Sequence, residues 1–429
     1  MASSTEVAGV SGSSYTRSEQ RKVIAAAGLG WGLEFFDLTL VALLVTPISK
    51  DFGITKADLG IVFTAQLIAT AFGGILFGWL ADKYGRKRVL TWTIWIFGVA
   101  TAATALSPSL AIFLVLRIIT GLGVGGEWAV GFALLNEAWS PGRRGLAGGA
   151  VQAAIWPAFA VAIYVTGAVP NWRWAFLVGV LPVIAAIWVR RSCPESKQWL
   201  ALQHGAVADP VSATPHREKK PGGTGAGALR ALFNGTTRRI VVLGTITVFG
   251  AQYSYYVYSS WMPAYLKTSL GVSAGTAQTV LYVSAAISLV SYVLAGAWSD
   301  VIGRRAALLW FAAVQLVAFI AFAILNVVHG AVPLIIVAYF VISFGLGYFA
   351  IFGAWFGELF ATPVRATGSS FCYSVGRGFA SFGPFIVGLL AAQYGLGGGI
   401  STGLIAVALM MGISRFLPDP SGRVITAAE

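Results

Sequence analysis

The chain has 429 residues, of which 57% are hydrophobic and only 10% are charged, whereas about a quarter of the residues of an average soluble domain are charged. This composition excludes a soluble globular fold. The apolar runs are long and continuous, unlike the ~10-residue alternating segments of a membrane β-barrel, so we expect an all-α integral membrane protein. The formal net charge is +13, but the basic residues lie on alternate loops, which indicates membrane topology and no binding to nucleic acid.

Apolar segments long enough to cross a bilayer recur from Val23 to Phe416 and predict twelve transmembrane helices. The predicted spans are residues 23–46, 59–81, 89–107, 110–135, 145–168, 172–190, 239–266, 276–299, 306–327, 331–355, 367–391 and 397–416.

The basic residues predict the orientation, with both termini in the cytoplasm. Of the 29 Lys and Arg residues, all but six lie on the cytoplasmic side. The exceptions are Lys50, Lys56, Arg173 and Lys267 outside, and Arg117 and Arg377 within spans. The first 22 residues lack the apolar region of a cleaved signal, so none is expected. We expect a multi-pass protein of the cell membrane, and specifically of a bacterial inner membrane.

Ionisable residues inside the predicted spans are functional candidates, because a charge in hydrocarbon is costly. In span one, Glu34 and Asp37 lie about 17 and 21 Å from the cytoplasmic edge, one turn apart on one face. Arg117 of span four lies level with Asp37. The sequence predicts an Asp37–Arg117 ion pair, which either packs the helices or opens when Asp37 is protonated. All three histidines fall in loops, so proton coupling is assigned to Glu34, Asp37 and Arg117.

Arg377 lies about 15 Å into span eleven, at the middle of the bilayer. No acid of the second half shares this depth, so a carboxylate of the cargo is its predicted partner, held by the guanidinium fork. The alternative is an ion pair with Glu34 across the two halves, and the two arrangements could alternate during transport. Glu127, near the inner end of span four, is expected to have a structural partner in the basic loops.

Polar and aromatic residues on one face of span seven and one face of span five are candidates to line a substrate cavity. They are Gln252, Tyr255, Tyr256 and Ser259 in span seven, and Gln152 and Trp156 in span five. Tyr258 and Trp261, nearer the outer end of span seven, are expected to anchor the helix at the membrane interface.

An internal repeat divides the chain into two halves. The loop from Gly78 to Arg88 is matched by the loop from Gly296 to Arg305, with Gly, Asp, Gly and Arg in register. An acid at a helix end, a tight Gly turn and several Arg predict a conformational brace, for which a purely topogenic loop is the alternative. The brace candidates are Asp82, Arg86, Glu127, Glu137, Arg144, Asp300, Arg304, Glu358 and Arg365.

The repeat sets the expected domains and the expected close helix contacts. The domains are a tail at 1–22, halves at 23–190 and 239–416, a cytoplasmic linker at 191–238 and a tail at 417–429. Glycine pairs within the spans predict that helices approach closely. These pairs are Gly74 with Gly78, Gly145 with Gly149, and Gly121 with Gly125.

The Gly-x-x-x-Asp-x-x-Gly-Arg loop, present in both halves, resembles the best-known signature of the major facilitator superfamily. Within it, Glu34 with Asp37, Arg117 with the run from Gly121 to Glu127, and the segment from Val364 to Arg377 resemble the sialate, lactate and aromatic acid proton symporters. The resemblance implies two six-helix bundles around a central cavity, a substrate site near the midplane and transport by rocking of the bundles. It adds Tyr373, next to Arg377, to the substrate-site candidates.

We therefore expect a secondary active transporter that imports a small organic anion, a monocarboxylate or an aromatic or hydroxy acid, together with protons. The expected partners are this anion, protons and the lipid bilayer; the chain is expected to be a monomer, without enzyme activity, metal or any cofactor beyond the coupling proton. The alternatives are a sugar or other metabolite carrier of the same superfamily, a non-transporting receptor of the same fold and an intramembrane enzyme. The sugar alternative is disfavoured by the single glutamine of span seven, Gln252.

Overall fold

The computed structural model describes residues 15–54, 56–203 and 230–420, and these residues are almost entirely helical, with no strand among them. The helices of the first half are α1 (Arg17–Leu43), α2 (Val45–Phe52), α3 (Lys56–Tyr84), α4 (Arg86–Thr104), α5 (Leu110–Ala138), α6 (Arg144–Ala153), α7 (Ile155–Ala168), α8 (Trp172–Leu177), α9 (Val180–Ser192) and α10 (Lys197–Gln203). Those of the second half are α12 (Gly235–Thr268), α13 (Ala274–Ile302), α14 (Arg304–Val327), α15 (Val332–Gly345), α16 (Phe349–Leu359), α17 (Arg365–Ala380), α18 (Gly383–Ile400) and α19 (Gly403–Ser414).

These helices account for the twelve predicted spans. Within the described residues, 10 helical segments are long and apolar enough to cross a membrane. Helix α4 falls short of this hydropathy because it begins with Arg86, Lys87 and Arg88. The last of the 10 segments, Thr362–Ile400, is the eleventh crossing followed by the first turn of the twelfth, because Gly395 adopts a positive φ of 70° and reverses the chain inside α18. The shorter apolar helix α19 completes the twelfth crossing. The twelve-helix prediction is confirmed.

The helix ends differ from the predicted span ends where polar residues extend or interrupt a helix. Helix α1 begins six residues before Val23, because Thr16 and Glu19 form a capping box that satisfies its free N–H groups. At its other end, α1 stops at Leu43 and a short separate helix, α2, follows. The basic cluster predicted in the linker, residues 216–220, lies outside the described residues.

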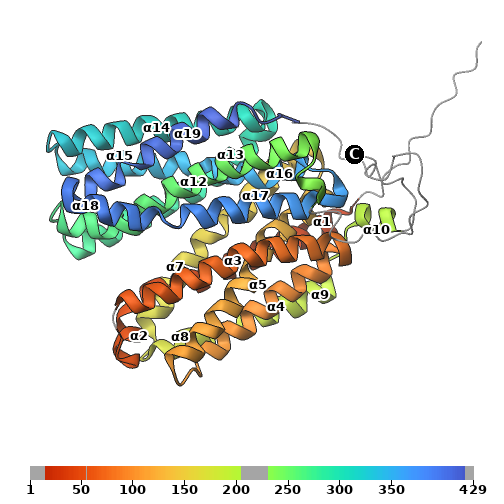
Figure 1. Cartoon of the computed structure of the whole chain (residues 1–429), viewed down its shortest axis with the longest axis horizontal. Coiled ribbons are helices and arrows are strands. Elements are labelled where there is room, and N and C mark those ends of the chain that lie inside the picture. Colours follow the sequence, from red (N-terminus) through yellow and green to blue (C-terminus); the bar gives the residue numbers. More distant parts are fainter. Residues whose placement is uncertain (1–14, 55, 204–229, 421–429) are drawn as a thin grey trace, which may run out of the picture.

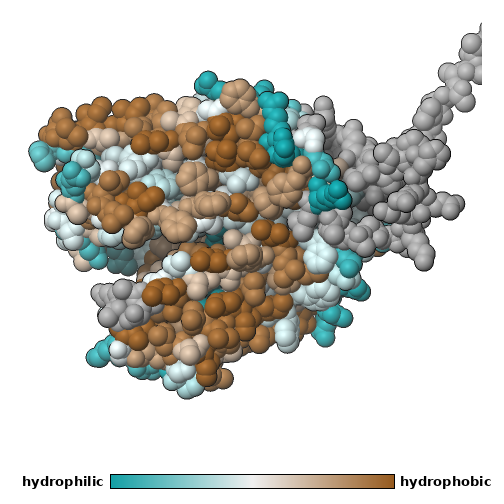
Figure 2. All heavy atoms as spheres, viewed as in Figure 1, coloured by the Kyte–Doolittle hydropathy of each residue, from teal (hydrophilic) through white to brown (hydrophobic). Residues whose placement is uncertain are grey.

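The two halves form a V (Figure 1). They meet at the end that carries the basic loops, α10 and residues 415–420, which is the cytoplasmic end. There α3 packs on α17, α6 on α13, and α5 on α16. At the opposite end, marked by α2, α8 and α18, the halves are separated, and Figure 2 shows a cleft between two lobes with broad apolar outer faces. The structure is closed toward the cytoplasm and open toward the outside.

Candidate functional site

Arg377 forms an ion pair across the two halves. Its Nη1 donates to Oε1 of Glu34 at 2.9 Å, and its Nε donates to the hydroxyl of Tyr256 at 3.1 Å. The prediction that Arg377 has no protein partner is wrong in this conformation, since α17 and α1 face each other and bring the Glu34 alternative into place. Arg377 keeps 11% of its side-chain surface exposed while Glu34 keeps 1%, so the guanidinium is the member of the pair that a ligand can reach.

The predicted ion pair between Asp37 and Arg117 is confirmed. The Nη1 of Arg117 donates to both carboxylate oxygens of Asp37, at 2.9 and 3.1 Å. Thr101 donates to Oδ1 at 2.7 Å and Gln66 to Oδ2 at 3.2 Å. Both charges are buried, and all of these partners belong to the first half. Thr101 and Gln66 were not among the predicted residues, since a lone threonine or glutamine in a span carries no spacing signal.

Glu34 and Asp37 therefore belong to two separate ion pairs. The sequence placed both on one face of α1 and treated them as one titrating pair. In the structure Asp37 is held inside the first half, whereas Glu34 reaches across to the second. Only the Glu34 pair is broken or formed when the halves move relative to each other. The buried Asp37 pair moves as part of one rigid half.

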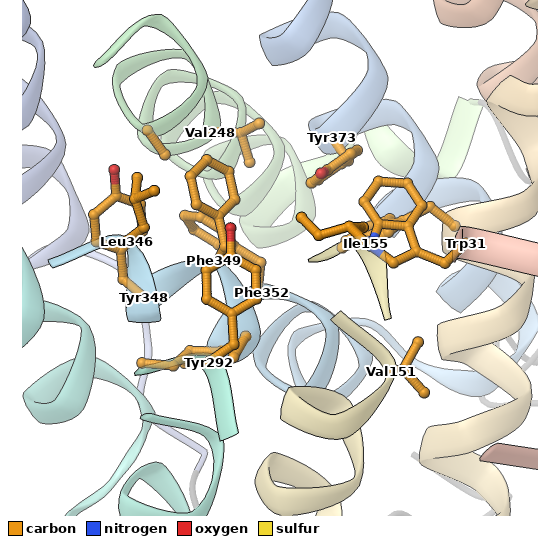
Figure 3. Close-up of a cluster of buried hydrophobic side chains, with 14 of the residues drawn as sticks. Trp31, Val151, Ile155, Val248, Tyr292, Leu346, Tyr348, Phe349, Phe352 and Tyr373 are labelled. Carbon is orange, nitrogen blue, oxygen red and sulfur yellow. The ribbon is translucent and has the colours of Figure 1, made fainter. Parts of the chain in front are cut away.

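An aromatic layer lies on the cytoplasmic side of the Glu34–Arg377 pair. Tyr373, one turn before Arg377 on α17, stacks on Trp128 of α5 with ring centroids 3.7 Å apart. Trp31, on the turn of α1 before Glu34, meets Tyr373 edge-on at 6.4 Å. Figure 3 shows Trp31 and Tyr373 turned toward each other from their two helices. The layer closes the path between the charged pair and the cytoplasm.

Residues predicted to line a cavity from span seven lie on the second-half side of this site. Tyr256 contacts Arg377 directly. Tyr255 packs against Tyr256, with the two ring centroids 5.7 Å apart. Gln252 is buried and lies one turn before Tyr256 on α12. The prediction that Tyr258 anchors the helix at the membrane interface is wrong. Its side chain is buried against Tyr339, because it lies on the inward face of α12.

The two span-five candidates bridge the halves. The amide nitrogen of Gln152 donates to the backbone oxygen of Phe349 at 2.9 Å. Trp156 meets Tyr292 edge-on at 5.9 Å. Both partners belong to the second half, so these side chains contribute to closure in this conformation.

Glu127 does not lie in the brace, contrary to expectation. Its side chain is 1% exposed, and neither carboxylate oxygen has a hydrogen-bond partner among the described residues. The Glu127 side chain lies against Gly30 of α1. A Cβ added at Gly30 would lie 2.6 Å from the carboxyl carbon of Glu127. It is too deep in the membrane for the basic loops to reach.

The first predicted brace is present and joins the two halves. Both carboxylate oxygens of Asp82 accept hydrogen bonds from the N-terminus of α17, including one of 2.8 Å from the backbone N–H of Thr367. Glu137 binds Arg86 at 3.3 Å within the first half and Arg365 at 2.7 Å in the second. These contacts confirm the predicted geometry of an acid at a helix end with arginine partners.

The second brace repeats this arrangement with the halves exchanged. Asp300 accepts hydrogen bonds of 2.8 Å from the backbone N–H groups of Gly145 and Leu146, at the start of α6. Glu358 binds Arg304 at 2.9 Å and Arg144 at 3.7 Å. The two braces together fasten the cytoplasmic end.

Comparisons with known proteins agree with this geometry. A model of the Major Facilitator Superfamily matches residues 27–236 and 244–428. The chain belongs to the Major Facilitator Superfamily. It is 30% identical to a probable 4-methylmuconolactone transporter of Cupriavidus pinatubonensis, over 95% of this chain and 92% of that protein. It is 27% identical to the sialic acid transporter NanX of Escherichia coli, over 91% of each chain.

A solved structure shares the fold. The proton:xylose symporter XylE, bound to 6-bromo-6-deoxy-D-glucose, superposes with a TM-score of 0.79 at 18% identity, over 96% of this chain and 98% of that one. As a superfamily member, this chain is a multi-pass membrane transporter and not an enzyme, and its bacterial relatives place it in an inner membrane.

The segment after α9 supports the first brace, which the sequence analysis did not foresee. Oε1 of Glu195 accepts from the backbone N–H of Lys87 at the start of α4, at 2.9 Å. The indole of Trp199 donates to the backbone oxygen of Asp82 at 2.9 Å. Cys193, just beyond the membrane span, is buried, and burial raises the pKa of its thiol to about 12, so this cysteine stays unreactive near neutral pH.

Two of the three predicted glycine pairs, Gly74 with Gly78 and Gly145 with Gly149, bring helices of the two superfamily halves into contact, whereas Gly121 with Gly125 packs α5 against α3 within the first half. A Cβ at Gly78 would lie 2.5 Å from the hydroxyl of Ser370 on α17, and one at Gly149 would lie 2.6 Å from the backbone oxygen of Tyr292 on α13. At Gly296, the repeat partner of Gly78, a Cβ would collide with the backbone of Gly145. Only glycine allows the cytoplasmic end to close this tightly.

Gly296→Leu is therefore expected to hold the cytoplasmic end open. A side chain forced into a packed contact costs about 1–3 kcal/mol, which lowers the closed population and transport by about fivefold to a hundredfold. The measurement is maleimide labelling of Ser370→Cys from the cytoplasmic side, which should rise; Cys193 and Cys372 are buried and add little background. The control is Gly412→Leu, since a Cβ there meets nothing within 4 Å. Equal labelling in both variants would contradict the assigned role.

Proposed function

We propose that this transporter imports a small organic anion together with protons, by alternating access. The observation that carries the proposal is the ion pair of Arg377 with Glu34, since it joins the two halves at the closed base of the outer cleft and leaves the guanidinium partly exposed. Its Nη2 makes no hydrogen bond to the described part of the chain, so a carboxylate can approach it.

Anion binding and proton binding are coupled by competition at Arg377. A carboxylate from the cleft replaces Glu34 at the guanidinium, which has a fork that suits two parallel hydrogen bonds. Glu34 then stands buried without a counter-charge, and this strongly favours its neutral form. A proton from the outer water bonds to a Glu34 oxygen, and the site holds one anion, one guanidinium and one neutral acid.

The loaded site is the state in which the halves are free to move. With Glu34 neutral, no charge pair ties α1 to α17, and the remaining ion pairs between the halves belong to the braces at the cytoplasmic end. The Asp37–Arg117 pair is the second proton site of the proposal, opened by protonation of Asp37. The relatives support the class of cargo: sialic acid carries a carboxylate, and the sialic acid transporter NanX aligns with 91% of this chain.

The test is uptake into proteoliposomes of a panel of labelled monocarboxylates, including aromatic and hydroxy acids, with and without an imposed inward proton gradient. We expect at least one acid to accumulate only when the gradient is present, and neutral sugars not to accumulate. Gradient-driven accumulation of a sugar, with none of any acid, would overturn the proposal in favour of the metabolite-carrier alternative.

A further inference from the structure

We propose that Glu127 is a proton-release site, which holds a proton in this outward-open conformation and gives it to the cytoplasm after the halves have moved. The inference rests on the proposed function and adds a residue to its cycle. Its basis is a carboxyl group that is buried, has no hydrogen-bond partner in the described part of the chain, and lies beside the aromatic layer on the cytoplasmic side of the transport site.

The position of Glu127 is built by glycine. Its Cγ and carboxyl group occupy the space that a side chain at Gly30 would fill, so the acid lies directly on the backbone of α1. Glu34 is one turn further along the same face of α1, a rise of about 6 Å. The two carboxyl groups are neighbours along the seam between α1 and α5, with Glu127 nearer the cytoplasm.

The surroundings of Glu127 favour its neutral form. The helices packed against α5 bring to the membrane interior Glu34 and Asp37 from α1 and Arg377 from α17, and carry their other charged residues at the helix ends. Asp37 is paired with Arg117, and Arg377 with Glu34. An ionised carboxylate without a partner in such a site costs several kcal/mol, and the negative charge of Glu34 adds to that cost.

The route to the cytoplasm is closed at present by the aromatic layer. Trp128, the next residue after Glu127, stacks on Tyr373 of the other half. When the halves separate at the cytoplasmic end, this stack parts and water reaches Glu127.

The proton balance of the release step follows from this order. Glu127 gives its proton to a cytoplasmic water molecule, and protonated Glu34 then gives its proton to the Glu127 carboxylate. Glu34, ionised again, returns to Arg377 and displaces the anion. One proton enters on Glu34 from outside and one leaves from Glu127, so Glu127 ends the cycle protonated, as it began.

The experiment is Glu127→Gln, which keeps the shape of the neutral acid but cannot release a proton. We expect gradient-driven accumulation of the anion to fall by at least about tenfold, as when a positioned proton carrier is lost, while anion binding and anion exchange across the membrane stay within about twofold. The matched control is Thr120→Val on the same helix, since the Thr120 hydroxyl bonds only to its own helix; it should transport normally.

A second readout does not depend on transport. At neutral pH, infrared difference spectra of the purified protein should contain a protonated-carboxyl band that Glu127→Gln removes. Full gradient-driven accumulation in Glu127→Gln, or an unchanged carboxyl band, would overturn the assignment, and loss of binding and exchange together would make Glu127 a structural residue. If the wild type accumulates no acid but the band is lost in the variant, the proposed function fails while the neutral carboxyl stands.

Discussion

Arg377→Lys is expected to lower the affinity for the transported anion by at least about tenfold, since a charge-assisted hydrogen bond contributes about 1.5–3 kcal/mol and lysine offers a point charge in place of the guanidinium fork. Arg377→Ala should abolish saturable binding. The measurement is equilibrium binding of the acid identified by the uptake panel, in detergent, without any gradient.

Arg173→Lys is the matched control for this prediction. Arg173 also binds a carboxylate, that of Asp51 at 2.8 Å, but on the outer surface with 30% of its side chain exposed. Exposed ion pairs contribute little, so this variant should bind the anion as the wild type does. Unchanged affinity in Arg377→Lys and Arg377→Ala would remove Arg377 from the binding site.

Arg117→Ala is expected to have the largest effect on stability. It leaves Asp37 buried without a counter-charge, and breaking a buried pair in this way costs about 3–5 kcal/mol. The thermal unfolding temperature of the purified protein should fall, and the double variant Asp37→Asn with Arg117→Ala should recover part of the loss, because the stranded charge is then gone. If the double variant is no more stable than Arg117→Ala, the pair does not act by compensating buried charge.

The single variant Asp37→Asn separates the two roles left open for this pair. If Asp37 carries a proton, this variant should lose gradient-driven accumulation while it still binds the anion at Arg377. If the pair only packs α1 against α5, accumulation should survive at a level set by the amount of folded protein. Accumulation per folded molecule equal to that of the wild type would therefore contradict the coupling role.

Much of the fold could be predicted because the membrane imposes simple rules. Apolar length predicted the twelve crossings, and the repeated Gly, Asp and Arg pattern predicted the braces, whose partners are set by helix ends. The level of Arg117 relative to Asp37 followed from the helical rise alone. Such predictions succeed when the partners are fixed by depth along a helix, which a sequence encodes directly.

The site was harder to predict because its contacts depend on rotation between the halves. The depth of Arg377 in the membrane was compatible with either the cargo or Glu34 as its partner. In this conformation the partner is Glu34, because α17 faces α1, and this orientation cannot be read from depth. The same limit applies to Glu127. Its position along α5 suggested a partner in the cytoplasmic loops, whereas its side chain fills the space beside Gly30 of α1. A glycine that makes room for a distant side chain has no local signature.

The ion pair between Arg377 and Glu34 also determines how this carrier responds to membrane voltage. With Glu34 ionised, the empty site has no net charge; with a monocarboxylate on Arg377 and a proton on Glu34, it again has none. When Glu34 alone carries a proton across, with Glu127 and the Asp37–Arg117 pair unchanged in charge, neither the loaded nor the empty crossing moves charge through the field. Uptake of a monocarboxylate is then driven by the pH difference alone, and a dicarboxylate would be opposed by an interior-negative potential.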